Sequence, residues 1–210
     1  MSATRPDDAT RPGPRAGASR AATATFALLG LSLLGGCAER ILAADRAAFI
    51  VEGAQVVVAA PAGRCIDPKS VELGSGGGFL LIGDCALFLP DTPPAGGALM
   101  PGLIRVGVTG APAGTDLAAF EAFLSADGRA ALSASRSAEE IAVLARRADA
   151  DGLFLKIADS AAGSETWRVF FPAGPRVLSA TFVPLDAPVT DTVALEELRR
   201  VVRATRGANV

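Results

Sequence analysis

Cysteines and carboxylates are the side chains in this 210-residue chain best suited to chemistry, because histidine and tyrosine are both absent. The cysteines are Cys37, Cys65 and Cys85. Without histidine the chain lacks the commonest general base near neutral pH and the commonest metal ligand, and a Ser-His-Asp triad is excluded. We therefore expect a protein that is not an enzyme and that holds no cofactor or metal.

Three further patterns resemble reactive motifs but lack required positions. Residues 74–78 are glycine-rich, but they precede an apolar run and lack the Gly-Lys-Ser/Thr ending of a phosphate loop. Residues 149–152 match only the middle of a calcium loop, and we interpret them as a turn. A hydrolase that uses carboxylates or a Ser–Lys pair is a lesser alternative, and its lysine would be Lys69 or Lys156, the only two in the chain.

Cys37 ends an apolar run that follows a basic N-terminus with four arginines in twenty residues. The run, counted over 21–36, is 16 residues long and falls short of the ~20 that a membrane-spanning helix needs. A positive segment, a short apolar segment and a small-residue exit are typical of a secretory signal. Leu34, Gly35 and Gly36 stand directly before the cysteine.

The tetrapeptide Leu34-Gly35-Gly36-Cys37 resembles the lipobox of bacterial lipoproteins. The resemblance implies that residues 1–36 are a signal peptide, that Cys37 becomes the lipidated first residue, and that acyl chains such as palmitate anchor the mature protein in a membrane. Two or more chains make such anchoring stable. In the sorting rule of enteric lipoproteins, alanine after the cysteine, here Ala38, implies the outer membrane facing the periplasm.

In an oxidising periplasm we expect the two remaining thiols, Cys65 and Cys85, to form a disulfide. Closing a loop of about 20 residues removes on the order of 3 kcal/mol of unfolded-state entropy. A redox-active dithiol or half of a metal site is the alternative. Such sites use Cys-x-x-Cys spacing or nearby histidines, and this chain has neither.

The mature part of the chain has 174 residues, enough for one domain with a substantial core. It carries 16 Lys+Arg against 20 Asp+Glu, a net charge of −4, which argues against nucleic acid as a partner. We divide the chain into a signal peptide over 1–36, a tether over 37–50 and one periplasmic domain over 51–210.

Seven apolar or alternating runs in the mature chain predict strands, and two amphipathic stretches predict helices. The strands are expected over 55–60, 78–82, 103–108, 141–146, 153–157, 166–171 and 177–183, and the helices begin near 115 and near 192. Residues 65–70 predict a turn that leads into a short helical piece. Residues 137–140 resemble a helical capping box, but the Asp-Gly pair at 151–152 favours a hairpin. The pattern predicts an α+β fold, with two main helices packed on a largely antiparallel sheet of about seven strands, and one disulfide.

Two surface features are candidates for binding. Four arginines crowd the last predicted helix: Arg199, Arg200, Arg203 and Arg206. They either complement the helix dipole on a solvated face or contact anionic lipid or an acidic partner. Trp167, the only tryptophan, lies in an alternating run, where a core position is commoner than a binding platform.

The segments Cys65–Pro68 and Asp84–Cys85 and the hairpin with Trp167-Arg168 make the mature chain weakly similar to alphaproteobacterial envelope proteins. The resemblance implies an envelope location and names no activity. We expect a membrane-anchored lipoprotein whose domain binds or scaffolds another envelope protein without catalysis. A periplasmic small-ligand binding protein that uses the sheet face around Trp167 is the alternative. The sequence predicts no oligomeric state.

Overall fold

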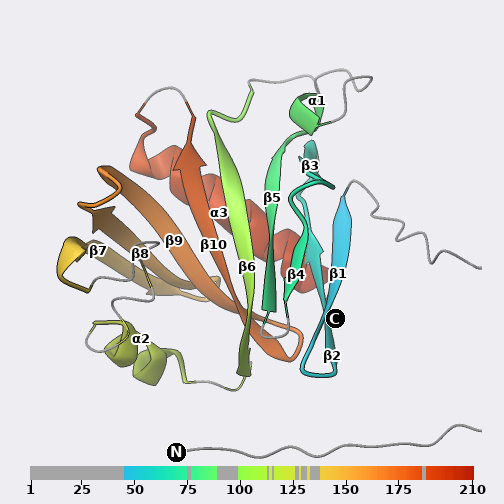
Figure 1. The fold of residues 1–210 in the computed structure, drawn as a ribbon, viewed down its shortest axis with the longest axis horizontal. Helices are drawn as coiled ribbons and strands as arrows, with labels where there is room; N and C mark the ends of the chain where they lie inside the picture. The colour runs from blue at the N-terminus through green and yellow to red at the C-terminus, as the bar shows by residue number, and fades with distance from the viewer. Residues whose placement is uncertain are drawn as a thin grey trace, which may run out of the picture. The chain divides into compact units, whose positions relative to one another are not determined.

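A mostly antiparallel β-sheet of eight strands dominates the computed structural model (Figure 1). The structure describes residues 45–74, 77–88, 99–112, 114, 116–125, 128, 132, 138–185 and 188–210. All of them belong to one compact unit, Arg40–Val210. The predicted signal peptide and Cys37 lie outside the described residues. Among the described helices, none is long and apolar enough to cross a membrane.

Every paired strand in the main sheet runs antiparallel to its neighbours, in the order β3-β5-β6-β10-β9-β8-β7. Strands β3 and β4 both pair with the same edge of β5. Strand β3 pairs with the end of β5, and β4 pairs with its start. The bounds are β3 Arg64–Ile66, β4 Glu72–Gly74, β5 Gly77–Asp84, β6 Gly102–Pro112, β7 Ile141–Asp149, β8 Gly152–Asp159, β9 Ser164–Ala173 and β10 Arg176–Pro184.

A separate two-stranded hairpin precedes the main sheet and corrects the expected tether. Strands β1 (Arg46–Val51) and β2 (Ala54–Ala59) pair across a tight turn at Glu52-Gly53, where both residues have positive φ, as type I′ hairpin turns require. Alternate residues of β1 are buried, among them Phe49. Residues 46–50, assigned to the tether from their alanine-rich composition, therefore belong to the fold.

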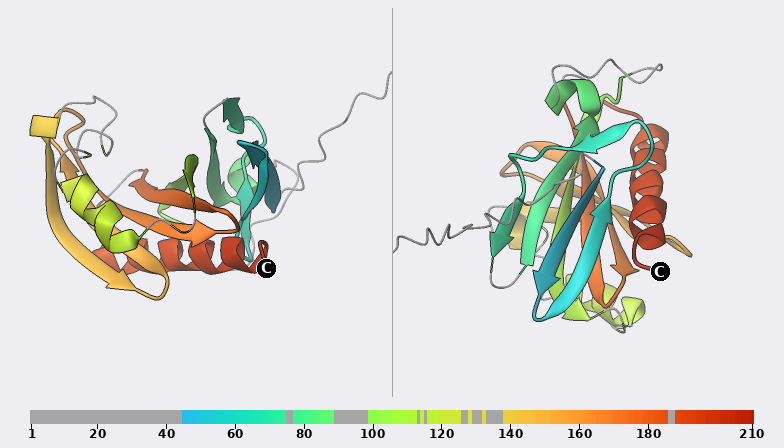
Figure 2. Two further views of the ribbon diagram at one scale, coloured as in Figure 1. Left: turned by 90° about the horizontal axis from the view of Figure 1, so that it is seen from below. Right: turned by 90° about the vertical axis from the view of Figure 1, so that its right-hand side faces the viewer.

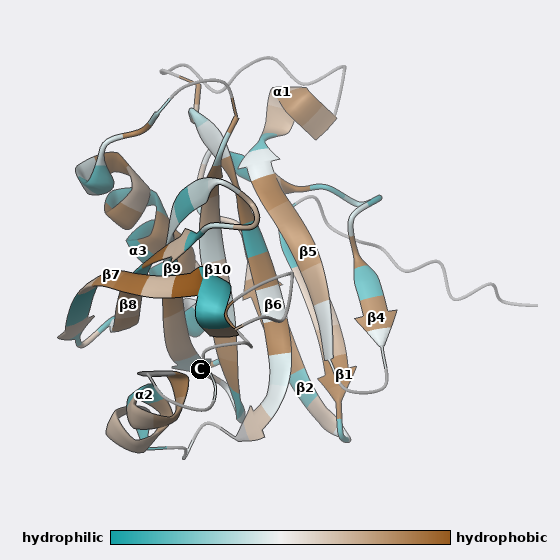
Figure 3. Ribbon diagram, turned by 60° about the vertical axis from the view of Figure 1, so that its left-hand side comes forward, coloured by the Kyte–Doolittle hydropathy of each residue, from teal (hydrophilic) through white to brown (hydrophobic). Residues whose placement is uncertain are grey.

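The long C-terminal helix α3 (Asp191–Gly207) covers one face of the sheet (Figure 2). Its apolar side is buried together with residues of β1, β2, β5, β6, β9 and β10 in the larger of two hydrophobic clusters. The helix alternates hydrophobic and hydrophilic segments, whereas β5 is hydrophobic along most of its length (Figure 3). Burying this side of α3 fixes which face of the sheet stays accessible.

The opposite face of the sheet carries the smaller hydrophobic cluster, at the end formed by β7, β8 and β9. Helix α2 (Leu117–Ser125) contributes Leu124 to it, and Phe120 packs edge-on against Phe170 with ring centroids 5.2 Å apart. The two other short helices are α1 (Cys85–Phe88) and a 3₁₀ turn (Ala138–Glu140). Over the middle of this face, no described helix packs against β6 or β10.

The seven predicted strands and two main helices all correspond to observed elements. The hairpin alternative over 141–157 is confirmed, and the capping-box residues form only the 3₁₀ turn Ala138–Glu140. The sheet nevertheless has eight strands rather than seven, because β3 and β4 were not predicted and β1 and β2 form their own pair. The expected helical piece after Cys65 is wrong: the chain forms β3, a turn and then β4.

Two side chains near the C-terminus complete the free edge of β2. The Asn209 side-chain amide accepts a hydrogen bond from the Val57 N–H (2.9 Å) and donates one to the Val57 carbonyl (2.6 Å). The Thr205 hydroxyl bridges the N–H and carbonyl of Ala59 in the same way, at 3.3 Å each. Thr205 lies in the last turn of α3 and Asn209 just beyond its end, and together the two side chains replace a neighbouring strand.

Candidate functional site

The middle of the sheet face opposite α3 carries a row of polar side chains on adjacent strands. Thr181 on β10 pairs with Arg105 on β6 and also with Arg168 on β9. Because directly opposed residues point to the same face, the two arginines flank the threonine. They line a groove of about 550 Å³, which we call the arginine groove.

Hydrogen bonding and stacking hold the two guanidinium groups differently. The Nε–H of Arg168 donates to the Thr181 hydroxyl at 2.8 Å. The Arg105 guanidinium lies over the Phe79 ring, 4.7 Å from its centroid. Among the described residues, no carboxylate forms an ion pair with Arg105. The Arg105 charge is therefore placed by an aromatic face rather than by an acid.

The lining of the arginine groove contains both apolar and polar residues. Its apolar lining includes Leu132, Val183, Pro184, Leu185 and Pro188. Val183 and Leu185 are 39% and 50% exposed, so this part of the lining is open to solvent. Asp159 and Glu165 belong to the polar lining. A groove of this volume with a few convergent polar groups has the size and character of a small-molecule site.

Burial and neighbouring charges both act on the pKa of Arg168. Burial, and next the neighbouring Arg105 charge, lower the pKa of Arg168 to about 10, while Asp159 opposes this shift less strongly. The guanidinium stays protonated at neutral pH. Its like-charged neighbour thus affects it more than the nearest acid does.

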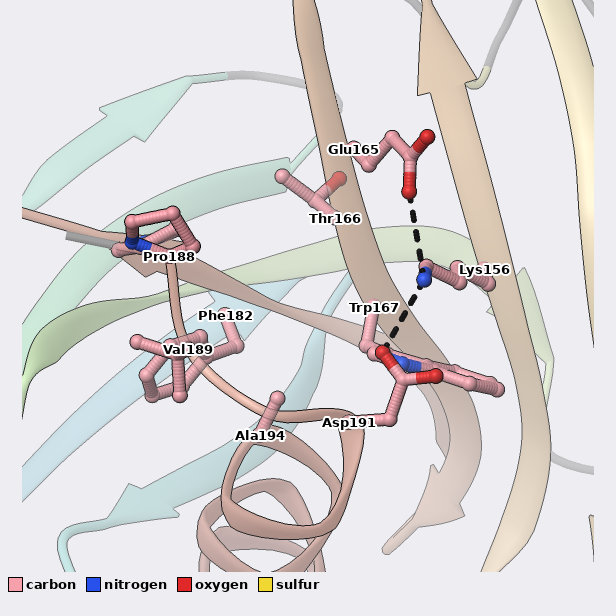
Figure 4. A pocket seen from close by; sticks show the side chains of 10 residues that line it. Lys156, Glu165, Thr166, Trp167, Phe182, Pro188, Val189, Asp191 and Ala194 are labelled. Atoms are coloured by element: carbon pink, nitrogen blue, oxygen red, sulfur yellow. Dashed lines mark ion pairs between the residues drawn. The ribbon is translucent and has the colours of Figure 1, made fainter.

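A smaller pocket of about 240 Å³ lies beside the groove, at the start of α3 (Figure 4). Its centre is Lys156, whose Nζ lies 3.1 Å from Asp191 Oδ1 and 3.2 Å from Glu165 Oε2. The Trp167 indole lies beside Asp191 in Figure 4, although its N–H has no hydrogen-bond partner of good geometry among the described residues. Asp191 has its pKa lowered by the Trp167 N–H and then by Lys156.

Neither lysine is placed for nucleophilic catalysis. Asp191, and next Glu165, raise the pKa of Lys156, so its amine is protonated at neutral pH and cannot serve as a general base there. The Ser70 hydroxyl beside Lys69 donates to the Asp67 carbonyl and accepts from the Leu81 N–H, both at 2.8 Å. That hydroxyl is thus used to hold a turn against β5.

A buried charge cluster next to the disulfide was missed by the sequence analysis. Arg64 pairs with Asp84 across β3 and β5, and with Glu197 on α3 at 3.1 Å. Asp84 also accepts the Met100 N–H at 2.6 Å, and Arg200 pairs with Glu197 at 3.0 Å. The side chains of Arg64, Asp84 and Glu197 are each about 10% exposed. We call these residues the Arg64 cluster.

The predicted disulfide between Cys65 and Cys85 is present, with Cα atoms 4.7 Å apart. It joins β3 to the first residue of α1, directly after β5. The antiparallel pairing places Cys65 opposite Gly83 and Arg64 opposite Asp84. Residues of opposite charge directly before the two cysteines were the sequence signal for the Arg64 cluster.

The four predicted surface arginines do not form one free patch. Arg199 pairs with Asp149 at 2.7 Å, Arg203 lies 3.4 Å from Asp151, and Arg206 donates to the Ala150 carbonyl. Arg200 instead joins the Arg64 cluster. The first three therefore bind the β7–β8 turn, whose acids the sequence analysis had assigned to a turn.

The Asp149 carboxylate illustrates how strongly this turn is held. Burial favours its neutral form, but the hydrogen bond from Arg199 and those from the Asp151 and Gly152 N–H groups outweigh burial and lower its pKa. The turn acids are thus occupied by arginines from α3. Among the described residues, no group of three or more Cys, Asp or Glu side chains could hold a metal ion.

Trp167 and Arg168 are neighbours in β9 and point to opposite faces of the sheet. Trp167 is 3% exposed and belongs to the cluster under α3, so the expected core position is confirmed. The open groove lies on the side of Arg168. Arg105 and Arg168 were missed, although each is a charged residue with apolar neighbours on both sides in its strand, which is the signal that could have identified them.

Comparison of the chain with known protein families, with curated proteins and with solved structures finds no match.

Proposed function

We propose that this protein is a lipoprotein of the bacterial envelope, anchored through lipid on Cys37, whose folded unit binds a small ligand without catalysis. The lipobox residues support the anchor, with Ala38 favouring the outer membrane and the periplasmic side. The Cys65–Cys85 disulfide fits an oxidising compartment.

The observation that carries the binding role is the arginine groove on the sheet face that α3 leaves open. Its volume of about 550 Å³ lies within the usual range for small-molecule sites. We therefore favour the small-ligand alternative over a scaffold for another envelope protein. The arginines of α3 are occupied within the chain, so we do not extend the proposal to them.

The anchor is tested by metabolic labelling with an alkynyl palmitate analogue, followed by membrane fractionation. We expect the wild type to take up the label and to sediment with membranes until detergent is added. The Cys37→Ser variant is expected to lose the label, whereas the Cys65→Ser/Cys85→Ser variant, the matched control, lacks the disulfide but keeps the label. An unlabelled wild-type protein that stays soluble would refute the anchored function.

A further inference from the structure

Acids among the described residues compensate the positive charges of Arg105 and Arg168 very little. In contrast, Arg64, Arg199 and Arg203 all form ion pairs with acids. Arg105 is exposed and rests on Phe79, and no described carboxylate pairs with it. A guanidinium held in place by stacking keeps its hydrogen-bond donors available for a ligand.

The two acids that line the groove, Asp159 and Glu165, also form contacts with residues other than the two arginines. The Glu165 carboxylate is turned to Lys156, at 3.2 Å. Asp159 accepts the Ala162 N–H at 3.0 Å, and its attraction for Arg168 is weaker than the repulsion from Arg105. An anion between the two arginines would therefore meet a net positive potential.

The groove also has apolar lining residues that an inorganic ion would leave uncovered. Val183 near the end of β10 and Leu185 just after it are exposed, and both line the groove together with Pro188. Covering apolar surface of this kind contributes roughly 25 cal/mol per Å². The site therefore combines an oxyanion position with a position for an apolar body.

We propose that the arginine groove binds a small organic anion, whose carboxylate or phosphate lies between Arg105 and Arg168 and whose apolar body packs on Val183 and Leu185. Guanidinium groups pair with either head group through parallel N–H···O bonds. Thr181 positions Arg168 by accepting its Nε–H, and we assign the two terminal nitrogens of Arg168 to the ligand. This assignment names a ligand class for the binding role proposed above and rests on it.

Calorimetry on the full-length protein as cells produce it tests the assignment with four probes. Hexanoate and hexyl phosphate carry both parts of the expected ligand, hexanol lacks the anion, and inorganic phosphate lacks the apolar body. We expect one or both amphiphilic anions to bind at millimolar concentrations or below, and to bind at least tenfold more tightly than hexanol and inorganic phosphate. Whether hexanoate or hexyl phosphate binds more tightly distinguishes a carboxylate ligand from a phosphate ligand.

Arginine variants test whether binding depends on the groove or only on the positive charge of the protein. Arg105→Ala, at an exposed position, is expected to weaken binding about tenfold or more, as for loss of a charge-assisted hydrogen bond. Arg199→Ala, the matched control, removes the same charge from α3 and is expected to leave binding unchanged. Arg168→Lys keeps the charge, loses the fork and is expected to weaken binding.

Three results would overturn the assignment: none of the probes binds, hexanol binds as tightly as the anions, or Arg105→Ala binds as the wild type does. Fractionation tests the anchor separately. A membrane-anchored protein that fails to bind anions rejects the ligand assignment alone. A soluble protein that binds them rejects only the anchored function.

Discussion

Arginines occur on both sides of this fold in contrasting surroundings. In the Arg64 cluster, Arg64 is buried between β3, β5 and α3, and Asp84 and Glu197 bind its two terminal nitrogens. In the arginine groove, Arg105 is exposed on an open sheet face, with an aromatic ring beneath it. Arg64 therefore stabilises the folded structure, whereas Arg105 remains available to bind another molecule.

The role of an arginine in this fold depends both on its burial and on whether an acid pairs with it. A buried charge whose partner is removed costs several kcal/mol, whereas an exposed charge contributes little to stability. The Arg64 cluster should therefore respond in stability and the arginine groove in binding. We expect the variants of the two regions to differ accordingly, from the largest loss of stability to the smallest.

Asp84→Ala is expected to have the largest effect. It leaves Arg64 buried without its strand partner and removes the acceptor of the Met100 N–H, so the free energy of unfolding should fall by about 3–5 kcal/mol. Urea denaturation followed by circular dichroism measures the change. Asp67→Ala, which removes an exposed turn acid that accepts the Lys69 N–H, is the control and should cost about 1 kcal/mol. Equal losses in the two variants would contradict the distinct role of Asp84.

Removal of the disulfide in Cys65→Ser/Cys85→Ser is expected to cost about 3 kcal/mol, because the bond closes a loop of 20 residues. Since the disulfide and the Arg64–Asp84 pair join the same two strands, the loss should not add simply to that of Asp84→Ala. A double-mutant cycle by denaturation should show coupling of about 0.5 kcal/mol or more. Strict additivity would show that the cluster and the disulfide act independently.

Arg199→Ala is expected to cost less than about 1 kcal/mol, because its ion pair with Asp149 is partly exposed and screened by solvent. The effect should depend on pH. The pKa of Asp149 is lowered in the folded state, so its contribution is complete above its ordinary value of 3.8 and is lost as pH falls through the folded value. Denaturation curves of variant and wild type should therefore converge in acid. A difference that persists unchanged at the lowest pH would assign the loss to packing instead.

Arg105→Ala is expected to have the smallest effect, within about 0.5 kcal/mol of the wild-type stability, because this side chain is exposed and has no ion-pair partner among the described residues. Thermal unfolding measures it. A loss as large as that of Asp84→Ala would show that Arg105 is a structural residue like Arg64, and the contrast between the two regions would disappear.

Most of the fold follows from the sequence pattern because the strands concerned are long and buried. Strands β8 and β10 are mostly apolar runs and helix α3 has helical spacing, and each was predicted close to its observed bounds. Strand β1 was assigned to the tether, and the two other strands that were missed carry weak signals. Strand β3 has three residues, and all three residues of β4 are exposed. Their strand conformation comes from pairing with β5, which is a tertiary contact.

The arginine groove could not be predicted, because it depends on the register between strands that lie far apart in the sequence. Thr181 joins Arg105 and Arg168 only through the pairing of β10 with both β6 and β9. Which face stays open also depends on where α3 and α2 pack. The disulfide, in contrast, followed from the number of cysteines and their expected compartment alone.

The contacts of Asn209 and Thr205 with β2 have a mechanical consequence for an anchored protein. Under the proposed anchor on Cys37, a pulling force would reach the β1–β2 hairpin first. The side-chain hydrogen bonds at Val57 and Ala59 pass that load from β2 to the last turns of α3. The apolar side of α3 is packed on the sheet, so the β1–β2 hairpin and the C-terminal helix would resist the force together.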